Sequence, residues 1–186
     1  MRVALFGGAF DPPHIGHQRI AQTMIEHKLA DEVWYVPVYE HPWAERLDKW
    51  EMAAYDDRLK MVELILDDHT YLREYPKLSL AYPTLLQFAK NYPTDDFSWI
   101  IGADNLSDFT DWDCYQQILE EFGVHVYPRA GFELKTDLPG MNLLTACKKV
   151  VASSTEIKQR LRSGQKVEQF LDPRVLKYIQ DHDLYQ

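Results

Sequence analysis

Residues 1–20 read MRVALFGGAFDPPHIGHQRI, and this stretch decides the fold. The apolar run at residues 3–6 ends in Gly7 and Gly8, as a buried parallel strand does, and residues 15–29 place apolar side chains at roughly helical spacing. A strand, a glycine turn and a helix in this order are typical of a parallel sheet covered by helices. The beginning of the chain therefore predicts an α/β fold.

The same alternation of strands and helices continues along the chain. Strands are predicted at residues 33–36, 97–101, 124–127 and 150–152, and helices at 57–66, 84–90, 115–122 and from Ser153 onward. No repeat or linker divides the sequence, so we predict one domain over residues 1–186, an α/β fold with a Rossmann-like, doubly wound parallel sheet. Ligands of such sheets bind at the carboxyl ends of the strands, near the switch in strand order.

Composition excludes several classes of protein. Of 186 residues, 46% are hydrophobic and 26% are charged, the balance of a packed globular domain. The formal net charge of -9 disfavours nucleic acid and anionic membranes as partners, although a few amides and cations can still hold a small anion. The sequence shows no membrane span, no signal-peptide pattern and only two cysteines, so we expect a cytoplasmic protein.

The first chemical motif is GGAFDPPHIGH, residues 7–17. Gly7 and Gly8 let backbone amides approach a phosphate without a Cβ in the way, and His14 and His17 direct two imidazoles at one anion from one face of a helix start. A tight turn explains a glycine pair equally well, and a capped helix start or a chance metal pair explains the two histidines. The eleven residues together are a stronger signal than either part, because they match the family pattern given below.

The second motif is IGADNL, residues 101–106, followed by Trp112. A carboxylate at Asp104, directly after the strand and Gly102, can accept hydrogen bonds from ribose hydroxyls, and Trp112 offers a flat surface for stacking. The alternative is that Asp104 caps a helix and that Trp112 packs in the core.

The third motif begins at Ser153 and continues through Ser154 and Thr155 to Lys158. Hydroxyls and free amides at the start of a helix, with a cation one turn later, suit the outer phosphates of ATP. A serine three residues before Glu156 is also the pattern of a capping box, and both interpretations can hold together.

The three motifs resemble those of the HxGH nucleotidyltransferase superfamily, GGxFDPxHxGH, and of its bacterial nicotinate-nucleotide adenylyltransferases, IGADxLxxFxxW and ISSTxIR. In that family the aspartate lies by the adenosine and the tryptophan stacks on the pyridine ring, which would be the roles of Asp104 and Trp112. Ala152 and Lys158 depart from the third pattern, and lysine lacks the two-pronged hydrogen bonding of arginine. Class I aminoacyl-tRNA synthetases share the letters HIGH, but this chain is too short for a tRNA-binding domain and has no KMSKS-like loop.

The acceptor motif also departs from the family. Family members carry Ser-Tyr-Thr, whose threonine helps to recognise the nicotinate carboxylate, and residues 81–84 here read AYPT. Pro83 has neither a hydroxyl nor an amide hydrogen for that role. Either Thr84 replaces the missing group or the acceptor is not nicotinate mononucleotide, and we take Tyr82, Thr84 and Trp112 as candidate acceptor-binding residues.

The segment after the second predicted strand lacks the family's Pro-Pro-His-Lys-like stretch, since residues 37–46 read PVYEHPWAER. Trp43 and Trp50, in or beside this irregular segment, either line a lid or anchor the loop to the body of the protein.

The resemblance implies transfer of AMP from ATP to the 5'-phosphate of nicotinate or nicotinamide mononucleotide, with release of pyrophosphate, in NAD biosynthesis. A phosphate monoester is mostly dianionic at neutral pH and needs no protein base, so His14 and His17 are expected to act as donors to the α-phosphate region. Mg²⁺ is expected to arrive with ATP. The residues expected to bind ATP are Gly7, Gly8, Phe10, Gly102, Asp104, Ser153, Ser154, Thr155 and Lys158.

Two alternatives stay open. One is an adenylyltransferase for another small phosphorylated acceptor such as phosphopantetheine, against which Gly102 and Asp104 with Trp112 favour a pyridine nucleotide. The other is a non-catalytic nucleotide-binding sensor, suggested by the altered residues 81–83. Intact His14 and His17 argue against the sensor, because binding alone needs no donors to the transition state.

Overall fold

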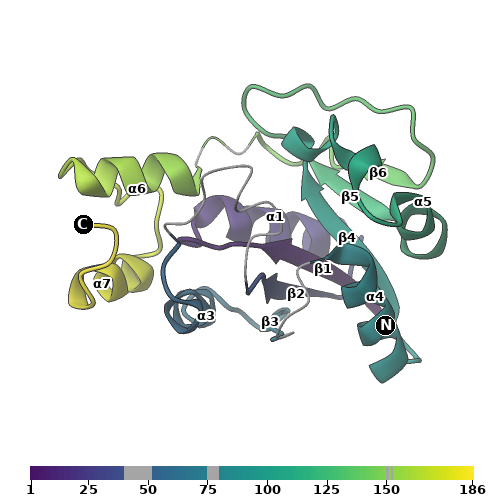
Figure 1. The fold of residues 1–186 in the computed structure, drawn as a ribbon, viewed down its shortest axis with the longest axis horizontal. Coiled ribbons are helices and arrows are strands. Elements are labelled where there is room, and N and C mark those ends of the chain that lie inside the picture. Colours follow the sequence, from purple (N-terminus) through teal and green to yellow (C-terminus); the bar gives the residue numbers. More distant parts are fainter. Residues whose placement is uncertain (40–51, 75–79, 150, 152) are drawn as a thin grey trace.

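The computed structural model describes residues 1–39, 52–74, 80–149, 151 and 153–186 (Figure 1). Trp43 and Trp50 lie outside the described residues, as do Val150 and Ala152. Among the helices that are described, none is long and apolar enough to cross a membrane.

Six strands form one parallel sheet in the order β3-β2-β1-β4-β5-β6. The order reverses between β1 and β4, which confirms the predicted doubly wound, Rossmann-like sheet and places its switch point at the end of β1. The strands are β1 (Arg2–Gly8), β2 (Glu32–Pro37), β3 (Thr70–Leu72), β4 (Asp96–Gly102), β5 (Val124–Tyr127) and β6 (Met141–Leu143).

Helices cover both faces of the sheet. Successive side chains of each strand point to opposite sides, so each strand contributes to a core on either face. In β1, Ala4 and Phe6 belong to one core cluster, and Val3 and Leu5 belong to the other. The first cluster includes buried residues of α1 (Ile15–Glu26), α3 (Tyr55–Glu63), α6 (Ser154–Arg162) and α7 (Pro173–Asp181). The second includes residues of α4 (Ala81–Asn91), of the short helix around Phe109 (Phe109–Asp111) and of the π-helix Ile118–Phe122, which follows α5 (Tyr115–Gln117).

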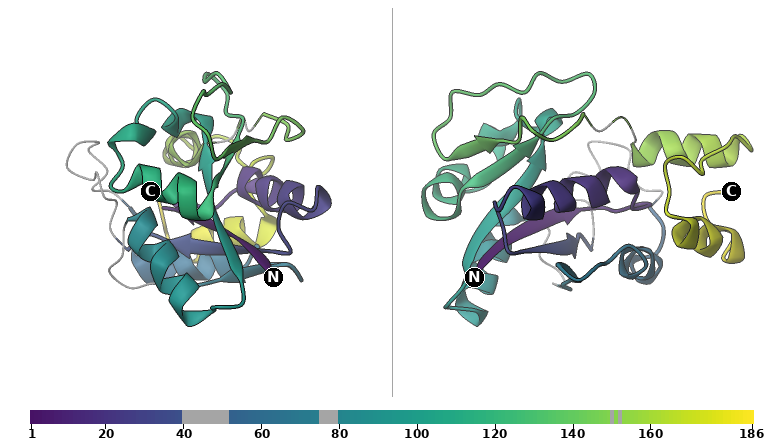
Figure 2. Two further views of the ribbon diagram at one scale, coloured as in Figure 1. Left: turned by 90° about the vertical axis from the view of Figure 1, so that its right-hand side faces the viewer. Right: turned by 180° about the vertical axis from the view of Figure 1, so that it is seen from behind.

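The C-terminal helices lie beyond the carboxyl end of β1. Figure 1 and the right-hand view of Figure 2 show α6, α7 and the C-terminus at the end of the molecule opposite the N-terminus, where β1 begins. The backbone amide of Ile15 donates to the carbonyl of Phe170 at 2.9 Å and joins the start of α1 to the loop before α7. The end of the chain is therefore packed against the predicted ligand-binding edge.

Both edge strands of the sheet, β3 and β6, differ from the prediction. The sixth strand is Met141–Leu143, whereas of the strand predicted at residues 150–152 only Val151 is described, in a loop and 70% exposed. Thr70–Leu72 was not predicted as a strand. Both missed strands have three residues, too few to show a periodic pattern. The helix predicted at 84–90 begins earlier, at Ala81, because Pro83 in its first turn needs no amide partner.

Arg58 ties the loops at this edge together. Its side chain is only 1% exposed, although arginine is almost never buried without partners. The guanidinium donates to four backbone carbonyls at 2.8–3.1 Å, those of Ala9, Val38, Tyr39 and Ala53. One side chain of α3 thus holds the loop after β1, the end of β2 and the approach to α3.

We predict that Arg58→Met destabilises the protein by about 3 kcal/mol, because four backbone carbonyls lose their charged donor at a buried position. Chemical denaturation measures the change. Lys60→Met, at an exposed position of the same helix, is the matched control and should shift the free energy of unfolding by less than about 0.5 kcal/mol. Equal effects of the two substitutions would contradict a structural role for Arg58.

Candidate active site

His14 and His17 stack on each other at the start of α1, with ring centroids 3.8 Å apart. His14 Nδ1 accepts the amide hydrogen of Gly16 at 3.1 Å, and His17 Nδ1 accepts that of His14 at 3.1 Å. The two histidines therefore form a capping box, so the capped helix start that was one alternative is present. Since each Nδ1 is an acceptor, a neutral ring carries its proton on Nε2, and both Nε2–H groups can donate to a ligand.

Both imidazoles are neutral near physiological pH. Burial lowers the pKa of His14 to about 3, with a smaller contribution from the positive charge of Arg129. Burial also lowers the pKa of His17, helped by His14 and again by Arg129. Phe10 contributes to this environment, since its buried ring packs edge-on against His17 with centroids 5.0 Å apart. The pair offers two hydrogen-bond donors without a charge of its own.

Arg129, directly beyond β5, is a functional candidate that the sequence analysis missed. Its Nη1 donates to Asp104 Oδ2 at 2.7 Å, and its charge acts on both histidines. It thereby joins the first motif to the second. The rule that ligands bind at the carboxyl ends of strands could have identified it, because Arg129 stands two residues after the end of β5.

Asp104 has one oxygen in use and one free for a ligand. Its Oδ1 is buried and has no hydrogen-bond partner among the described residues. A Cβ at Gly102 would meet this oxygen at 2.2 Å, so only glycine leaves room for the carboxylate in this position. A buried acceptor without a donor costs free energy. A ligand hydroxyl that donated to Oδ1 would remove this cost.

The glycines of the first motif serve packing as well as access. A Cβ on Gly7 would lie 2.3 Å from the ring of Trp99, and one on Gly8 would lie 3.1 Å from the ring of Phe10. Gly7 therefore lacks a side chain because β4 presents a tryptophan there. The prediction considered only the approach of a phosphate.

The third motif lies against the first. Ser153 caps α6, its Oγ accepting from the amide of Glu156 at 3.1 Å, and Ser154 Oγ donates to the carbonyl of Pro12 at 3.0 Å. Thr155 is exposed. Lys158 Nζ donates to Asp11 Oδ2 at 2.7 Å. The two serine hydroxyls and the ammonium group of Lys158 thus all have partners inside the protein, and the exposed Thr155 lies beside them in the first turn of α6.

The predicted acceptor residues differ in their accessibility. Trp112 is half-buried, with its ring packed on Phe109 at 5.2 Å between centroids. Tyr82 donates its hydroxyl to Glu121 at 3.0 Å. Thr84 is only 2% exposed and donates its hydroxyl to the carbonyl of Leu80 at 2.7 Å. The hydroxyl of Thr84 completes the first turn of α4, and its contact with an acceptor stays a prediction.

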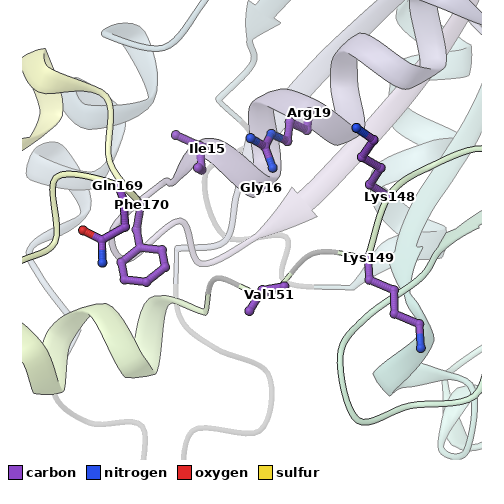
Figure 3. Close-up of a pocket in the computed structure, with 8 residues that line it drawn as sticks. All are labelled: Ile15, Gly16, Arg19, Lys148, Lys149, Val151, Gln169 and Phe170. Atoms are coloured by element: carbon purple, nitrogen blue, oxygen red, sulfur yellow. The ribbon is translucent and has the colours of Figure 1, made fainter.

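A cavity of about 210 Å³ opens at the start of α1, where Ile15 and Gly16 line it (Figure 3). It was not predicted, although its first two lining residues directly follow His14. Apolar side chains and three cationic ones surround it, a combination that suits an anionic ligand with an aromatic ring. The lining residues are Ile15, Gly16, Arg19, Lys148, Lys149, Val151, Gln169 and Phe170. Within the described part of the chain, no group of three or more potential metal-binding side chains comes together.

Residues 5–160 match the sequence model of the cytidylyltransferase-like family. The chain is 33% identical to a probable nicotinate-nucleotide adenylyltransferase of Bacteroides thetaiotaomicron, covering 98% of this chain and 92% of the relative. It is 32% identical to one of Salinibacter ruber, over 100% and 98%. Among solved structures, the Plasmodium falciparum nicotinic acid mononucleotide adenylyltransferase complexed with NaAD is similar in fold, with a TM-score of 0.82, 17% identity and coverage of 99% and 97%.

We predict that acid destabilises the protein through the buried histidines. The folded pKa of His14, about 3, lies below the ordinary value of 6.5, so between these pH values the unfolded chain binds more protons. The free energy of unfolding is then highest above about pH 6.5 and falls as the pH decreases. One such histidine lowers it by about 2 kcal/mol at about pH 5. His14→Asn keeps a capping side chain and should lose about that much of the difference in unfolding free energy between about pH 7.5 and pH 5.

Urea denaturation at the two pH values measures the difference, and His27→Asn controls for loss of an exposed imidazole. The same acid sensitivity in His14→Asn as in the unaltered chain would show that His14 is not held neutral by the fold.

Proposed function

The chain belongs to the cytidylyltransferase-like family, and we propose that it transfers AMP from ATP to the 5'-phosphate of nicotinate mononucleotide, releasing pyrophosphate, as a cytoplasmic enzyme of NAD biosynthesis. The observation that carries this proposal is the stacked pair His14 and His17, whose Nδ1 atoms both accept backbone amides and leave two neutral Nε2–H donors near the switch point of the sheet. The curated relatives support the acceptor, because they match this chain over nearly its whole length.

The reaction needs alignment and charge stabilisation more than it needs a base. An oxygen of the acceptor phosphate, mostly dianionic at neutral pH, attacks the α-phosphorus, and the bond from this phosphorus to pyrophosphate breaks. His14 and His17 donate hydrogen bonds to the α-phosphate oxygens as charge redistributes. Arg129 adds a positive charge to the same place, which offsets the repulsion between the two anionic substrates.

The outer phosphates of ATP meet the first turn of α6. This turn is bonded to the loop after β1 through Ser154, and its backbone amides, with Thr155 and Lys158, hold the phosphates. Mg²⁺ enters as part of the substrate, MgATP, whose phosphate oxygens are the hard ligands that this ion prefers.

The nucleoside of ATP is held from two sides. The free Oδ1 of Asp104 accepts a hydrogen bond from a ribose hydroxyl. The adenine occupies the cavity beside α1, where Ile15, Val151 and Phe170 supply apolar surface and three cations attract the anionic nucleotide. The pyridine ring of the acceptor stacks on Trp112, whose side chain remains partly accessible.

We predict that the purified protein releases pyrophosphate from MgATP with nicotinate mononucleotide, faster than with nicotinamide mononucleotide and much faster than with phosphopantetheine. His17→Ala should lower kcat about 100- to 1000-fold, because a donor to the transition state is lost, and should change the dissociation constant of MgATP less than threefold. His27→Ala, at an exposed site, should match the unaltered enzyme. Nucleotide binding without turnover on any of the acceptors would instead favour a sensor.

We predict that Trp112→Ala raises KM for nicotinate mononucleotide about tenfold, because the stacking surface for the pyridine ring is lost. KM for ATP should stay within about twofold of its original value. Trp112→Phe, which keeps an aromatic ring, should recover most of the loss. A rise in KM for ATP equal to the rise for the acceptor would place Trp112 outside the acceptor site.

A further inference from the structure

Asp11 is a buried carboxylate at the centre of the loop that carries the histidines. Its side chain is 3% exposed, so each of its oxygens needs partners inside the protein. Oδ2 accepts from Lys158 Nζ at 2.7 Å. Oδ1 accepts from Tyr185 Oη at 2.6 Å and from the amide of Ala53 at 3.0 Å. The three donors come from α6, from the C-terminal end of the chain and from the approach to α3.

Tyr185 helps to hold the orientation of the Asp11 carboxylate toward the lysine. Its hydroxyl and the amide of Ala53 both donate to Oδ1, which favours the orientation of the carboxylate in which Oδ2 accepts from Lys158. Burial and the neighbouring charge of Asp11 raise the pKa of Tyr185, so its hydroxyl keeps the proton that it donates. The tyrosine ring also lies 5.9 Å from Lys158 Nζ, within the range of a cation–π contact.

The backbone near Tyr185 is built for this contact. Asp183 and Tyr185 both have positive φ, at 51° and 64°, which residues other than glycine adopt only when the surrounding structure holds them. Between them Leu184 packs against the core and donates its amide to Ile179 at 3.0 Å. These contacts turn the tail back over the loop after β1, so that Tyr185 reaches a residue 174 positions earlier in the chain.

We propose that Tyr185 is a positioning residue for the phosphates of ATP, acting through Asp11 and Lys158. This inference rests on the proposed function, in which Lys158 serves the outer phosphates at the start of α6. With Oδ1 held, Asp11 keeps the ammonium group one turn beyond the free amides of the helix. Without the tyrosine hydroxyl, Oδ1 keeps only the amide of Ala53, so Asp11 can turn further toward the lysine and draw it away from the nucleotide.

The chain offers a matched control in Tyr178 of α7. Its hydroxyl donates to Asp57 Oδ1 at 2.9 Å, so it too joins the C-terminal region to a carboxylate, but at the first turn of α3. Tyr185→Phe and Tyr178→Phe each remove one hydroxyl and keep the ring. Any general effect of loosening the C-terminal region should appear in both variants.

We expect Tyr185→Phe to weaken MgATP binding about three- to tenfold, measured by calorimetry, and to raise KM for ATP by the same factor, while KM for the acceptor stays unchanged. Tyr178→Phe should leave all three values unchanged. In the Lys158→Ala background, Tyr185→Phe should have no further effect on MgATP binding, because the tyrosine acts through the lysine. Melting temperatures of all variants confirm that they are folded.

Unchanged MgATP binding in Tyr185→Phe would overturn the inference, and so would a loss of the same size in both lysine backgrounds. An equal loss in Tyr178→Phe would also overturn it, because the effect would then belong to the whole C-terminal region. Binding by calorimetry needs no turnover. If the unaltered protein binds MgATP but releases no pyrophosphate, the proposed reaction fails while the role of Tyr185 is still decided by the binding data.

Discussion

The hydrogen bonds of the buried Asp11 carboxylate are the interaction on which the rest of the site depends. A buried charge is tolerated only when it is paired and fully hydrogen-bonded, so its partners cannot move independently of it. Through Lys158 it joins α6 to the loop after β1, and through Tyr185 it joins the end of the chain to the same loop. Arg58 secures this loop by donating to the carbonyl of Ala9. Segments distant in the sequence thereby form one rigid edge.

This rigidity explains how a protein with a net charge of -9 can bind two anionic substrates. The overall field repels them, so attraction must come from groups held in place at short range. Arg129 pairs with Asp104, Lys158 pairs with Asp11, and the two histidines are uncharged. In the proposed reaction, groups that are oriented before substrate arrives need little reorganisation when charge develops on the α-phosphate.

The sequence predicts the parts of the site that are local. The strand that ends at Gly8, the capped helix start at His14 and the cap at Ser153 each depend on residues close together in the chain. The structure confirms all three. Contacts between distant residues leave no such pattern. Arg129 meets Asp104 across 25 positions and Tyr185 meets Asp11 across 174, so neither spacing nor periodicity reveals them. Thr84 shows a second limit of sequence comparison. A motif cannot reveal that the hydroxyl of Thr84 already donates to a backbone carbonyl at the start of α4.

The central claim is that His14 and His17 present neutral Nε2–H donors to the α-phosphate, and NMR of the ¹⁵N-labelled imidazoles tests it most directly. At about pH 7 and without nucleotide, both rings should show the tautomer with the proton on Nε2 and with Nδ1 as an acceptor. MgATP should shift both Nε2 resonances and leave both Nδ1 resonances nearly unchanged. Imidazolium rings at this pH, the opposite tautomer, or Nε2 resonances that do not respond to MgATP would contradict the account.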